Sequence, residues 1–365
     1  MNVPKFVCFL LPFALLAACG GSAAQPPAPT SAGKPAASGH EEIVNRAKAE
    51  GALKAQSTAD PASIKLFREG FSKKYPFIKF DLQEITGTEA TQRFVLELKS
   101  GAAKDWDVLN VAEEVFPDML PFIEPVDVLS LAEQGALAIP PKMIYPEGRD
   151  IMAPGTQLGV VAYNKKLVPE DKVPKVWDDL LKPEWKGRKL IADVRPNTIA
   201  GLVPAKGEAW VKDFAGKLKD QQPVWARGNT HSLTSLAAGE YTMHSGTYAN
   251  SVQRLIEKGS DTLGYVAPEP VSLRLALATG IQKGSKHVNA GLLWMEYLAS
   301  PEAQKILDEV EPVKASVYGD GTTRSAKLTA GKQLSVVAWD LFPKMSGYEK
   351  MILEAYGLPQ AEIKE

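Results

Sequence analysis

Four pairs of small, mostly polar residues stand where a predicted strand gives way to a predicted helix. The pairs are Ser57-Thr58, Gly87-Thr88, Asn197-Thr198 and Asn229-Thr230. A helix that begins at such a pair points its free backbone N–H groups and the positive end of its dipole outward. These termini therefore suit an anion or another oxygen-rich ligand. The alternative is that each pair only caps its own helix.

Two arginines lie beside these helix starts. Arg195 and Arg227 each precede an Asn-Thr pair by two residues. A guanidinium group can donate two parallel hydrogen bonds to one carboxylate or phosphate. A solvated surface position is the plainer interpretation of either arginine alone. Taken with the helix starts, the two predict the capture of an anion.

The histidines do not form a catalytic pattern. The sequence has four, His40, His231, His244 and His287, and no two of them are three to five residues apart. The H-E-x-x-H spacing of zinc proteases is therefore absent, and "HSGTY" is not the G-x-S-x-G elbow of serine hydrolases. His244 and Ser245 are neighbours in a predicted strand, so their side chains point to opposite faces. These features disfavour hydrolase chemistry.

Both cysteines precede the predicted folded part. Cys8 lies in an apolar run that follows Lys5, and Cys19 follows in "LLAACGG". A basic residue and an apolar run ending in small residues are typical of a secretory signal peptide, and this run is too short to span a membrane. Its end resembles a bacterial lipoprotein signal, which implies removal of residues 1–18 and acylation of Cys19. The alternative is a plain signal peptide with an incidental cysteine.

Residues 19–40 are predicted to be the lipidated cysteine and a disordered linker. Between 20 and 39 the only charge is Lys34, and the rest is Gly, Ser, Ala, Pro, Gln and Thr, a composition that cannot form a packed core. The folded part then has no thiol, which excludes disulfides and cysteine-based metal or catalytic sites there. The formal net charge of -1 gives no electrostatic case for nucleic acid as a partner.

Beyond residue 40 the chain alternates strand and helix patterns. Strands are predicted at 52–56, 78–82 and 106–111. "STADP" opens the first helix between them, with Ile64, Phe67, Phe71 and Tyr75 on one face. The second helix runs from Gly87-Thr88 to Gly101. This order predicts an α/β layer with a largely parallel sheet.

A second block of the same kind begins at "APGTQLGVVAYNKKL". The length of the folded part favours two lobes over a single core. The predicted domains are a first part of lobe 1 at 41–153, lobe 2 at 154–267, a return to lobe 1 at 268–318, and a helical C-terminal segment at 319–365 whose lobe is unassigned. The new strands are predicted at 158–163, 189–193 and 241–245, with two more in "TLGYVAPEPVSLRLALATG", and the helices at 208–218 and 230–238.

Four segments resemble, in the same order, the extracellular solute-binding proteins of ABC importers, in particular the ferric-binding-protein-like branch. They are "EGALKAQSTADPASIKLFREGFSKKYPFIKFDL", "WDVLNVAEE", "GVVAYNKKLVPEDKVPKVWDDLLKPEWKGRKLIADVRP" and "NAGLLWMEYLASPEAQKIL". The resemblance implies the two-lobed type II periplasmic binding protein fold, with mixed sheets flanked by helices and a hinge of crossing strands. It also implies closure on one ligand and docking on a membrane permease. The lobes would switch near "DIMAPGTQLG" and "APEPVSLRL".

The resemblance raises the question of iron. Ferric-binding relatives hold Fe(III) chiefly with two adjacent tyrosines, often with a glutamate and a histidine, and such oxygen ligands suit a hard cation. Here "MHSGTYANS" contains Tyr248 without a neighbouring tyrosine. Glu113 and Glu114 lie where the glutamate would be, and Gln56-Ser57-Thr58 takes the place of the histidine. This departure favours an organic or phosphorylated anion, with Tyr248 as a pocket wall, a hydrogen-bond donor or a packed core residue.

The sequence thus predicts a non-enzymatic, monomeric lipoprotein without a cofactor, anchored at the periplasmic or extracellular face of a cell membrane. It would capture a small oxygen-rich, anionic solute between two lobes and deliver it to a permease. The alternatives are an Fe(III)-binding protein using Tyr248 and Glu113, a surface lipoprotein that binds a protein partner, and a hydrolase. The predicted ligand-binding residues are Ser57, Thr58, Gly87, Thr88, Glu113, Arg195, Asn197, Thr198, Arg227, Thr230, Tyr248 and Glu269.

Overall fold

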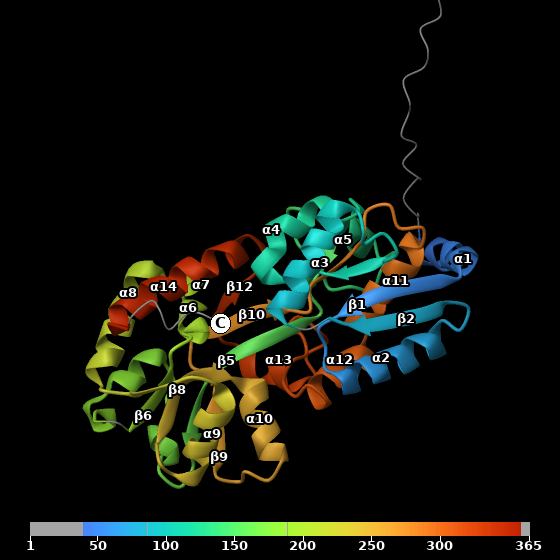
Figure 1. Ribbon diagram of the computed structural model, residues 1–365. Coiled ribbons are helices and arrows are strands. Elements are labelled where there is room, and N and C mark those ends of the chain that lie inside the picture. The colour runs from blue at the N-terminus through green and yellow to red at the C-terminus, as the bar shows by residue number, and fades with distance from the viewer. Residues whose placement is uncertain (1–38, 86, 188, 359–365) are drawn as a thin grey trace, which may run out of the picture. The chain divides into compact units, whose positions relative to one another are not determined.

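Two β-sheets organise the part of the chain that the computed structural model describes, residues 39–85, 87–187 and 189–358 (Figure 1). The predicted signal peptide, the predicted lipidation site Cys19 and nearly all of the predicted linker lie outside these residues. We call the first sheet with its helices lobe 1 and the second sheet with its helices lobe 2. None of the helices in the described ranges has the length and apolar character needed to cross a membrane.

The sheet of lobe 1 has five strands, with parallel pairing at one side and antiparallel pairing at the other. The strands in spatial order are β2 (Lys79–Glu84), β1 (Ala52–Ser57), β3 (Val108–Asn110), β11 (Thr279–Ile281) and β4 (Ile151–Met152). Strand β1 is parallel to β2 and β3, whereas β11 is antiparallel to β3 and β4. The carboxyl ends of β1, β2 and β3 therefore lie at one edge of the sheet.

Helices with apolar faces cover this sheet. They are α1 (His40–Glu50), α2 (Pro61–Lys74), α3 (Thr88–Ser100), α4 (Phe116–Met119), α5 (Val128–Glu133), α11 (Val288–Ala299) and α12 (Pro301–Glu309). The predicted face of α2 is confirmed, since Ile64, Phe67 and Phe71 are buried. The ring of Phe71 packs edge-on against Trp294 of α11 with centroids 5.3 Å apart.

The sheet of lobe 2 has seven strands and is also mixed. Its order is β12 (Leu334–Val337), β10 (Val271–Ala276), β5 (Gly155–Asn164), β8 (Met243–Tyr248), β6 (Leu190–Asp193) and β7 (Val224–Ala226), and β9 (Leu263–Val266) also pairs with β5. The long central strand β5 is antiparallel to β10, β8 and β9. Strand β6 is parallel to β7 and β8.

The helices of lobe 2 include the last helix of the described chain. They are α6 (Asn197–Ala200), α7 (Val203–Lys206), α8 (Glu208–Asp220), α9 (Asn229–Ala238), α10 (Ala249–Glu257), α13 (Arg324–Thr329) and α14 (Met345–Tyr356). Helix α14 (red in Figure 1) packs against α8 and α6. Short 3-10 turns lie at η1 (Glu113–Val115), η2 (Leu120–Phe122), η3 (Pro141–Met143), η4 (Glu170–Lys172), η5 (Trp177–Leu181), η6 (Pro183–Trp185) and η7 (Trp339–Lys344).

The chain passes between the two sheets three times. The passages lie between β4 and β5, between β10 and β11, and between α12 and β12. The predicted α/β class with mixed sheets flanked by helices is confirmed. Strand β10 lies in the second sheet although it falls within 268–318, the segment predicted to return to lobe 1.

One prediction about secondary structure is wrong. The sequence predicts a helical segment at 319–365, but 334–337 forms strand β12 at the edge of the second sheet. The strand has the buried pattern of period two, with Ser335 and Val337 inward, and it pairs in parallel with β10. Tertiary pairing with β10 outweighed the helical pattern of the residues that follow. The C-terminal segment thus contributes both a strand and a helix to lobe 2.

Candidate functional site

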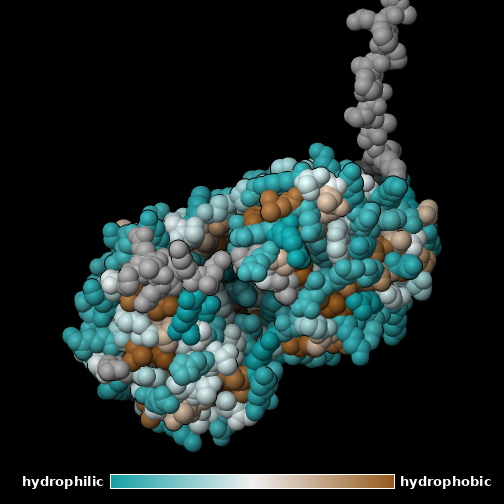
Figure 2. Space-filling view, in the orientation of Figure 1, coloured by the Kyte–Doolittle hydropathy of each residue, from teal (hydrophilic) through white to brown (hydrophobic). Residues whose placement is uncertain are grey.

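A cavity of about 280 Å³ lies where lobe 1 meets the strands that cross to lobe 2. It is lined by groups that follow β1 and β3 and by groups on the crossing segments, including Thr58, Asn110, Glu113, Gln157, Lys314 and Phe342. Ligands of open α/β sheets bind outside the carboxyl ends of the strands, and this cavity has that position. Figure 2 shows the surface hollowed and hydrophilic between the two lobes.

A second cavity, of about 350 Å³, lies at the opposite edge of the first sheet. Its walls come from the amino ends of β1 and β2 and from the loop after β11, and include Lys54, Trp106, Lys286 and His287. The Lys54 ammonium group already lies 4.2 Å from the centroid of the Trp106 ring, and His287 Nδ1 is 2.9 Å from Asp107 Oδ1. Since Lys54 and His287 already have partners and this cavity lies away from the lobe junction, we assign the candidate site to the first cavity.

Arg274 on β10 is the central charged group beside the first cavity. Its Nε and Nη2 donate to the two carboxylate oxygens of Glu113 on η1, so the pair joins lobe 2 to lobe 1. Its Nη1 lies 3.5 Å from the hydroxyl oxygen of Tyr248. The side chains of Arg274 and Glu113 are only 17% and 20% exposed. Burial lowers the pKa of Arg274, and the nearby charge of Glu349 opposes that shift.

Tyr248 ends β8 beside Asn197, the first residue of α6. Burial raises the pKa of the Tyr248 phenol well above its usual range, and the charge of Glu349 adds to the rise. A hydrogen bond from Asn197 and the charge of Arg195 act in the opposite direction. The phenol is therefore a hydrogen-bonding group at neutral pH rather than a phenolate.

Arg195 approaches the same group of side chains from the end of β6. Its backbone N–H donates to Asp193 Oδ1 at 2.8 Å, and its Nη2 lies 3.4 Å from Asp193 Oδ2. The Arg195 side chain is about half exposed, at 52%. Because the ion pair is long and the guanidinium faces solvent, Arg195 can turn toward an anion at little energetic cost.

A second ion-paired group lies at the lobe 1 side of the cavity. Lys314, which lines the cavity, pairs with Glu311, whose side chain is fully buried. Glu311 Oε1 also accepts a hydrogen bond of 2.9 Å from the backbone N–H of Asp60, at the start of α2. The Asp60 carboxylate in turn pairs with Arg254 on α10, which makes a further contact between the lobes.

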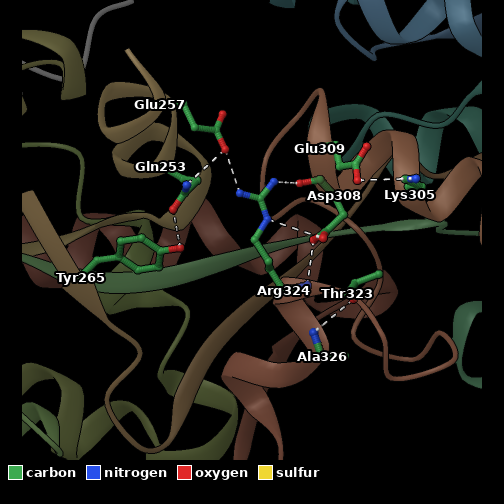
Figure 3. Close-up of polar contacts among 9 residues, drawn as sticks. All are labelled: Gln253, Glu257, Tyr265, Lys305, Asp308, Glu309, Thr323, Arg324 and Ala326. Atoms are coloured by element: carbon green, nitrogen blue, oxygen red, sulfur yellow. Dashed lines mark hydrogen bonds and ion pairs between the residues drawn. The ribbon is translucent and has the colours of Figure 1, made fainter. Parts of the chain in front are cut away.

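Helix α10 has another link toward lobe 1, shown in Figure 3. Arg324 Nη1 lies 2.8 Å from Glu257 Oε1 on α10, and Arg324 Nε lies 3.5 Å from Asp308 Oδ2 on α12. Gln253 and Tyr265 extend this network on the lobe 2 side, with Tyr265 donating to Gln253 Oε1 at 3.0 Å. Two arginine-centred networks therefore join α10 to lobe 1.

The structure brings together five of the residues predicted from the sequence. Thr58 and Glu113 line the cavity, and the Thr58 hydroxyl donates to Asn110 Oδ1 at 3.3 Å. Arg195, Asn197 and Tyr248 interact near Arg274. Whether these five bind the solute stays a prediction.

Three other predicted residues, Ser57, Thr198 and Glu269, are not among the groups that line this cavity in the described structure. The Ser57 hydroxyl oxygen accepts a hydrogen bond of 3.1 Å from the Ala59 N–H. The Thr198 hydroxyl donates to the Thr247 carbonyl oxygen at 3.4 Å. Glu269 Oε1 accepts from the Gln333 N–H at 3.0 Å, which fixes the turn before β12. The remaining positions, Gly87, Thr88, Arg227 and Thr230, are at or near the starts of α3 and α9. For all seven, ligand binding stays a prediction.

Two residues of the candidate site were not predicted. Arg274 is a lone charge in the apolar strand "VSLRLA", where alternation places it on the face opposite Leu273 and Leu275. Glu349 follows Met345 by four residues and precedes Ile352 by three, which places a carboxylate in the apolar stripe of α14. The signals are thus a lone charge in an apolar strand and a charge in the apolar stripe of a helix.

Among the residues that the structure describes, no three His, Cys, Asp or Glu side chains form a group that could hold a metal ion. The two residues considered for Fe(III), Tyr248 and Glu113, both contact the Arg274 guanidinium. An incoming cation would have to displace that guanidinium from both oxygens.

Comparison with known proteins places the chain in a family. Residues 67–330 match the family model for bacterial extracellular solute-binding proteins. The chain is 24% identical over 294 residues to the Fe(3+)-binding periplasmic protein of Serratia marcescens, covering 74% of this chain and 80% of that protein. Its fold is similar to Trichodesmium IdiA (FutA) in complex with iron and citrate, with a TM-score of 0.68, 20% identity and coverage of 85% of this chain and 100% of the other.

A further similar structure is iron-bound HitA from Pseudomonas aeruginosa. The TM-score is 0.62 at 18% identity, with coverage of 83% of this chain and 99% of the other. These structural similarities confirm the predicted two-lobed periplasmic binding protein fold. The family match spans well over half of the chain, so the chain belongs to the bacterial extracellular solute-binding protein family.

Proposed function

We propose that the protein is the solute receptor of an ABC importer and that it binds a small oxygen-rich solute with an anionic group between lobes 1 and 2. The observation that carries the proposal is the position of Arg274, beside the cavity at the lobe junction and between Glu113 of lobe 1 and Tyr248 of lobe 2. A ligand that contacts groups from both lobes stabilises the closed arrangement, because only that arrangement offers all the contacts.

Glu113 occupies the Nε and Nη2 edge of Arg274, which leaves Nη1 directed to the Tyr248 hydroxyl. The anionic group would bind at Nη1, with Tyr248 as a further donor. Arg195 would supply a second guanidinium after turning from Asp193, and Thr58 would contribute a hydroxyl from lobe 1. These groups bind and orient a solute without a nucleophile and base pair, so we infer a receptor rather than an enzyme.

The test is isothermal titration calorimetry with small carboxylates, sulfonates and phosphate esters, beside native mass spectrometry of any solute that co-purifies. We expect stoichiometric binding of an anion-bearing solute and no turnover of it. Binding that is equally strong in Arg274→Ala, with the variant correctly folded, would remove Arg274 from the site and contradict this form of the proposal.

Fe(III) is a second candidate solute. It is supported by the names of the relatives, which include an Fe(3+)-binding protein and a structure with iron and citrate, and by the closeness of Tyr248 and Glu113 to one guanidinium. A phenolate bound to Fe(III) absorbs visible light, so loading with ferric citrate followed by desalting gives a direct test. Colour that is lost in Tyr248→Phe would favour iron, whereas a colourless protein would exclude it.

We further propose that the receptor is exported and held to the membrane by acylated Cys19, with residues 20–39 as a tether to the solute-binding part. The support is the sequence around Cys19 and the absence of other cysteines beyond it. Two or more acyl chains are needed for stable anchoring. Cys19→Ser should shift the protein from the membrane fraction to the soluble fraction and leave solute affinity unchanged. Equal membrane association of both forms would contradict lipid anchoring.

A further inference from the structure

Glu349 occupies an unusual place for a carboxylate. Helix α14 buries Met345, Ile352 and Tyr356, and residue 349 lies on the same face, four residues after the first and three before the second. Helix α14 packs against α8 and α6, and α6 begins at Asn197 (Figure 1). A glutamate in the apolar stripe of a helix is costly to keep unless a partner or a function compensates for its burial.

The charges around Glu349 do not compensate for it fully. Arg274 is paired with Glu113, and Arg195 with Asp193. Counting Glu349, this cluster has two cations and three carboxylates. Within the described residues, Glu349 itself has no hydrogen bond or ion pair. It interacts with Arg274 and Arg195 only through their charge, while burial raises its pKa. When all three carboxyl groups are ionised, the cluster is therefore one positive charge short.

A neutral acceptor in this cluster also lacks a donor. Asn197, which hydrogen-bonds to Tyr248, has its Oδ1 buried without a hydrogen-bond partner in the described structure. Buried polar atoms nearly always have partners, so this oxygen favours a ligand that donates a hydrogen bond. An anion without N–H or O–H groups would satisfy neither this oxygen nor Glu349.

We propose that Glu349 recognises a protonated amine and that the solute is a small zwitterion, with its anionic group at Arg274 and its ammonium group at Glu349. The inference rests on the proposed function, since it uses the same site. An ammonium group supplies the missing positive charge, and its N–H donors suit the Glu349 carboxylate and the unpaired Asn197 oxygen. Glu349 lies beyond residues 67–330, the range of the family match, so the C-terminal helix would adapt this chain's site to its own solute.

The experiment compares matched pairs of compounds that differ only in an amine, such as β-alanine with propionate and taurine with ethanesulfonate. Calorimetric titration is done on the full-length protein, on Glu349→Gln and on the control Glu354→Gln, which changes an exposed glutamate of the same helix. We expect the unchanged protein to bind the amine-bearing member of at least one pair about tenfold more tightly, since a charge-assisted hydrogen bond in a partly buried site has that magnitude.

In Glu349→Gln this preference should fall to less than about twofold, while the amine-free anion binds as well as before or better. Glu354→Gln should retain the preference. If Glu349→Gln weakens both members of a pair equally, the residue only supports Arg274 and the inference is overturned. If the anions bind tightly but the amine gives no preference, the inference is overturned and the proposed function stands. If no member of any pair binds at millimolar concentration, the inference and the anion-binding form of the proposed function both fall.

Discussion

Arg274 is the residue on which the two lobes converge, because one guanidinium contacts Glu113 of lobe 1 and Tyr248 of lobe 2. Arg274→Lys keeps the charge but removes the planar fork that matches both oxygens of a carboxylate. Because the fork that holds Glu113 also fixes the direction of Nη1, the proposed donor to the solute, we expect solute affinity to fall about tenfold. The measurement is calorimetric titration of the solute found by native mass spectrometry.

Arg93→Lys is the matched control for this substitution. The Arg93 side chain is 76% exposed on α3 and makes only a 3.6 Å ion pair with Glu97, one turn away. This substitution should leave affinity unchanged. Equal affinity of the Arg274→Lys protein and the unchanged protein would show that the arginine fork has no part in binding.

His244 predicts a dependence of stability on pH. The imidazole is fully buried on β8, and its Nδ1 accepts a 3.2 Å hydrogen bond from the Gly246 N–H. Burial lowers its pKa to about 4, although the charge of Asp193 opposes the shift. A His with a lowered pKa stabilises the fold above its unfolded pKa of about 6.5, and that contribution is lost as pH falls toward 4.

At pH 5 the loss from His244 should be about 2 kcal/mol relative to pH 7 or above. Urea unfolding of the unchanged protein and of His244→Gln at pH 7 and pH 5 measures it by difference, since other groups titrate alike in both. The unchanged protein should lose about 2 kcal/mol more than the variant. The same loss in both proteins would mean that His244 does not titrate with unfolding.

At this scale the sequence predicted those site residues that follow strands. Thr58 comes directly after β1 and was found by the rule about the carboxyl ends of strands, whereas Glu113, three residues after β3, and Tyr248, at the end of β8, were found through the resemblance to ferric-binding proteins. Arg274 and Glu349 could not be found in that way. One lies within a strand and the other within a helix, and which neighbours face them depends on how β10 and α14 pack in lobe 2.

Among the elements, α10 ties lobe 2 to lobe 1 through two charged contacts. Arg254 pairs with Asp60 at the start of α2, and Glu257 pairs with Arg324, which also contacts Asp308 of α12 (Figure 3). The Arg254 and Asp60 side chains are each 40% exposed. An ion pair this exposed contributes at most about 1 kcal/mol, and less at high salt.

Arg254→Ala should therefore weaken solute binding by about twofold to fivefold, because it removes one contact that holds lobes 1 and 2 together in the described arrangement. The swap Arg254→Asp with Asp60→Arg should restore part of the affinity, whereas either reversal alone should weaken it further. Titration at low and high salt completes the test, since the effect should shrink as salt rises. Single reversals that bind as tightly as the swap would refute the role of this pair.

The elements themselves were largely predictable, and the exceptions have physical causes. Helix α2 has a Pro at its start and apolar residues three and four apart, and it forms as expected. Strand β12 was missed because four residues with Ser335 at their centre give little signal alone. It becomes a strand only because β10 offers its edge, and single-sequence patterns do not show partners so distant in the chain.

For the whole molecule, the point of interest is Gly155, where the three passages between the lobes meet. It is the first residue of β5, and it forms a bridge with Ala315. A Cβ atom at this position would lie 3.2 Å from the Lys314 carbonyl oxygen, 3.3 Å from the Ala276 carbonyl oxygen and 3.2 Å from Leu277 Cδ1. These neighbours come from the other two passages, and two of the three atoms are backbone, which cannot turn aside as a side chain can.

Gly155→Ala should therefore push the crossing segments apart by a few tenths of an ångström and lower the free energy of unfolding by about 1–3 kcal/mol, the usual cost of overpacking. It should also weaken solute binding, because Lys314 and Ala276 line the cavity and move with those segments.

Gly216→Ala in the middle of α8 is the control. Nothing lies within 4 Å of its Cβ position, so it should raise stability by about 0.5–1 kcal/mol without changing affinity. Alanine stabilises the middle of a helix relative to glycine, whereas at the crowded crossing it destabilises the fold. The two substitutions should therefore shift the unfolding midpoint in opposite directions. A rise for both would show that the crossing segments yield freely, and that the hinge does not hold the cavity in shape.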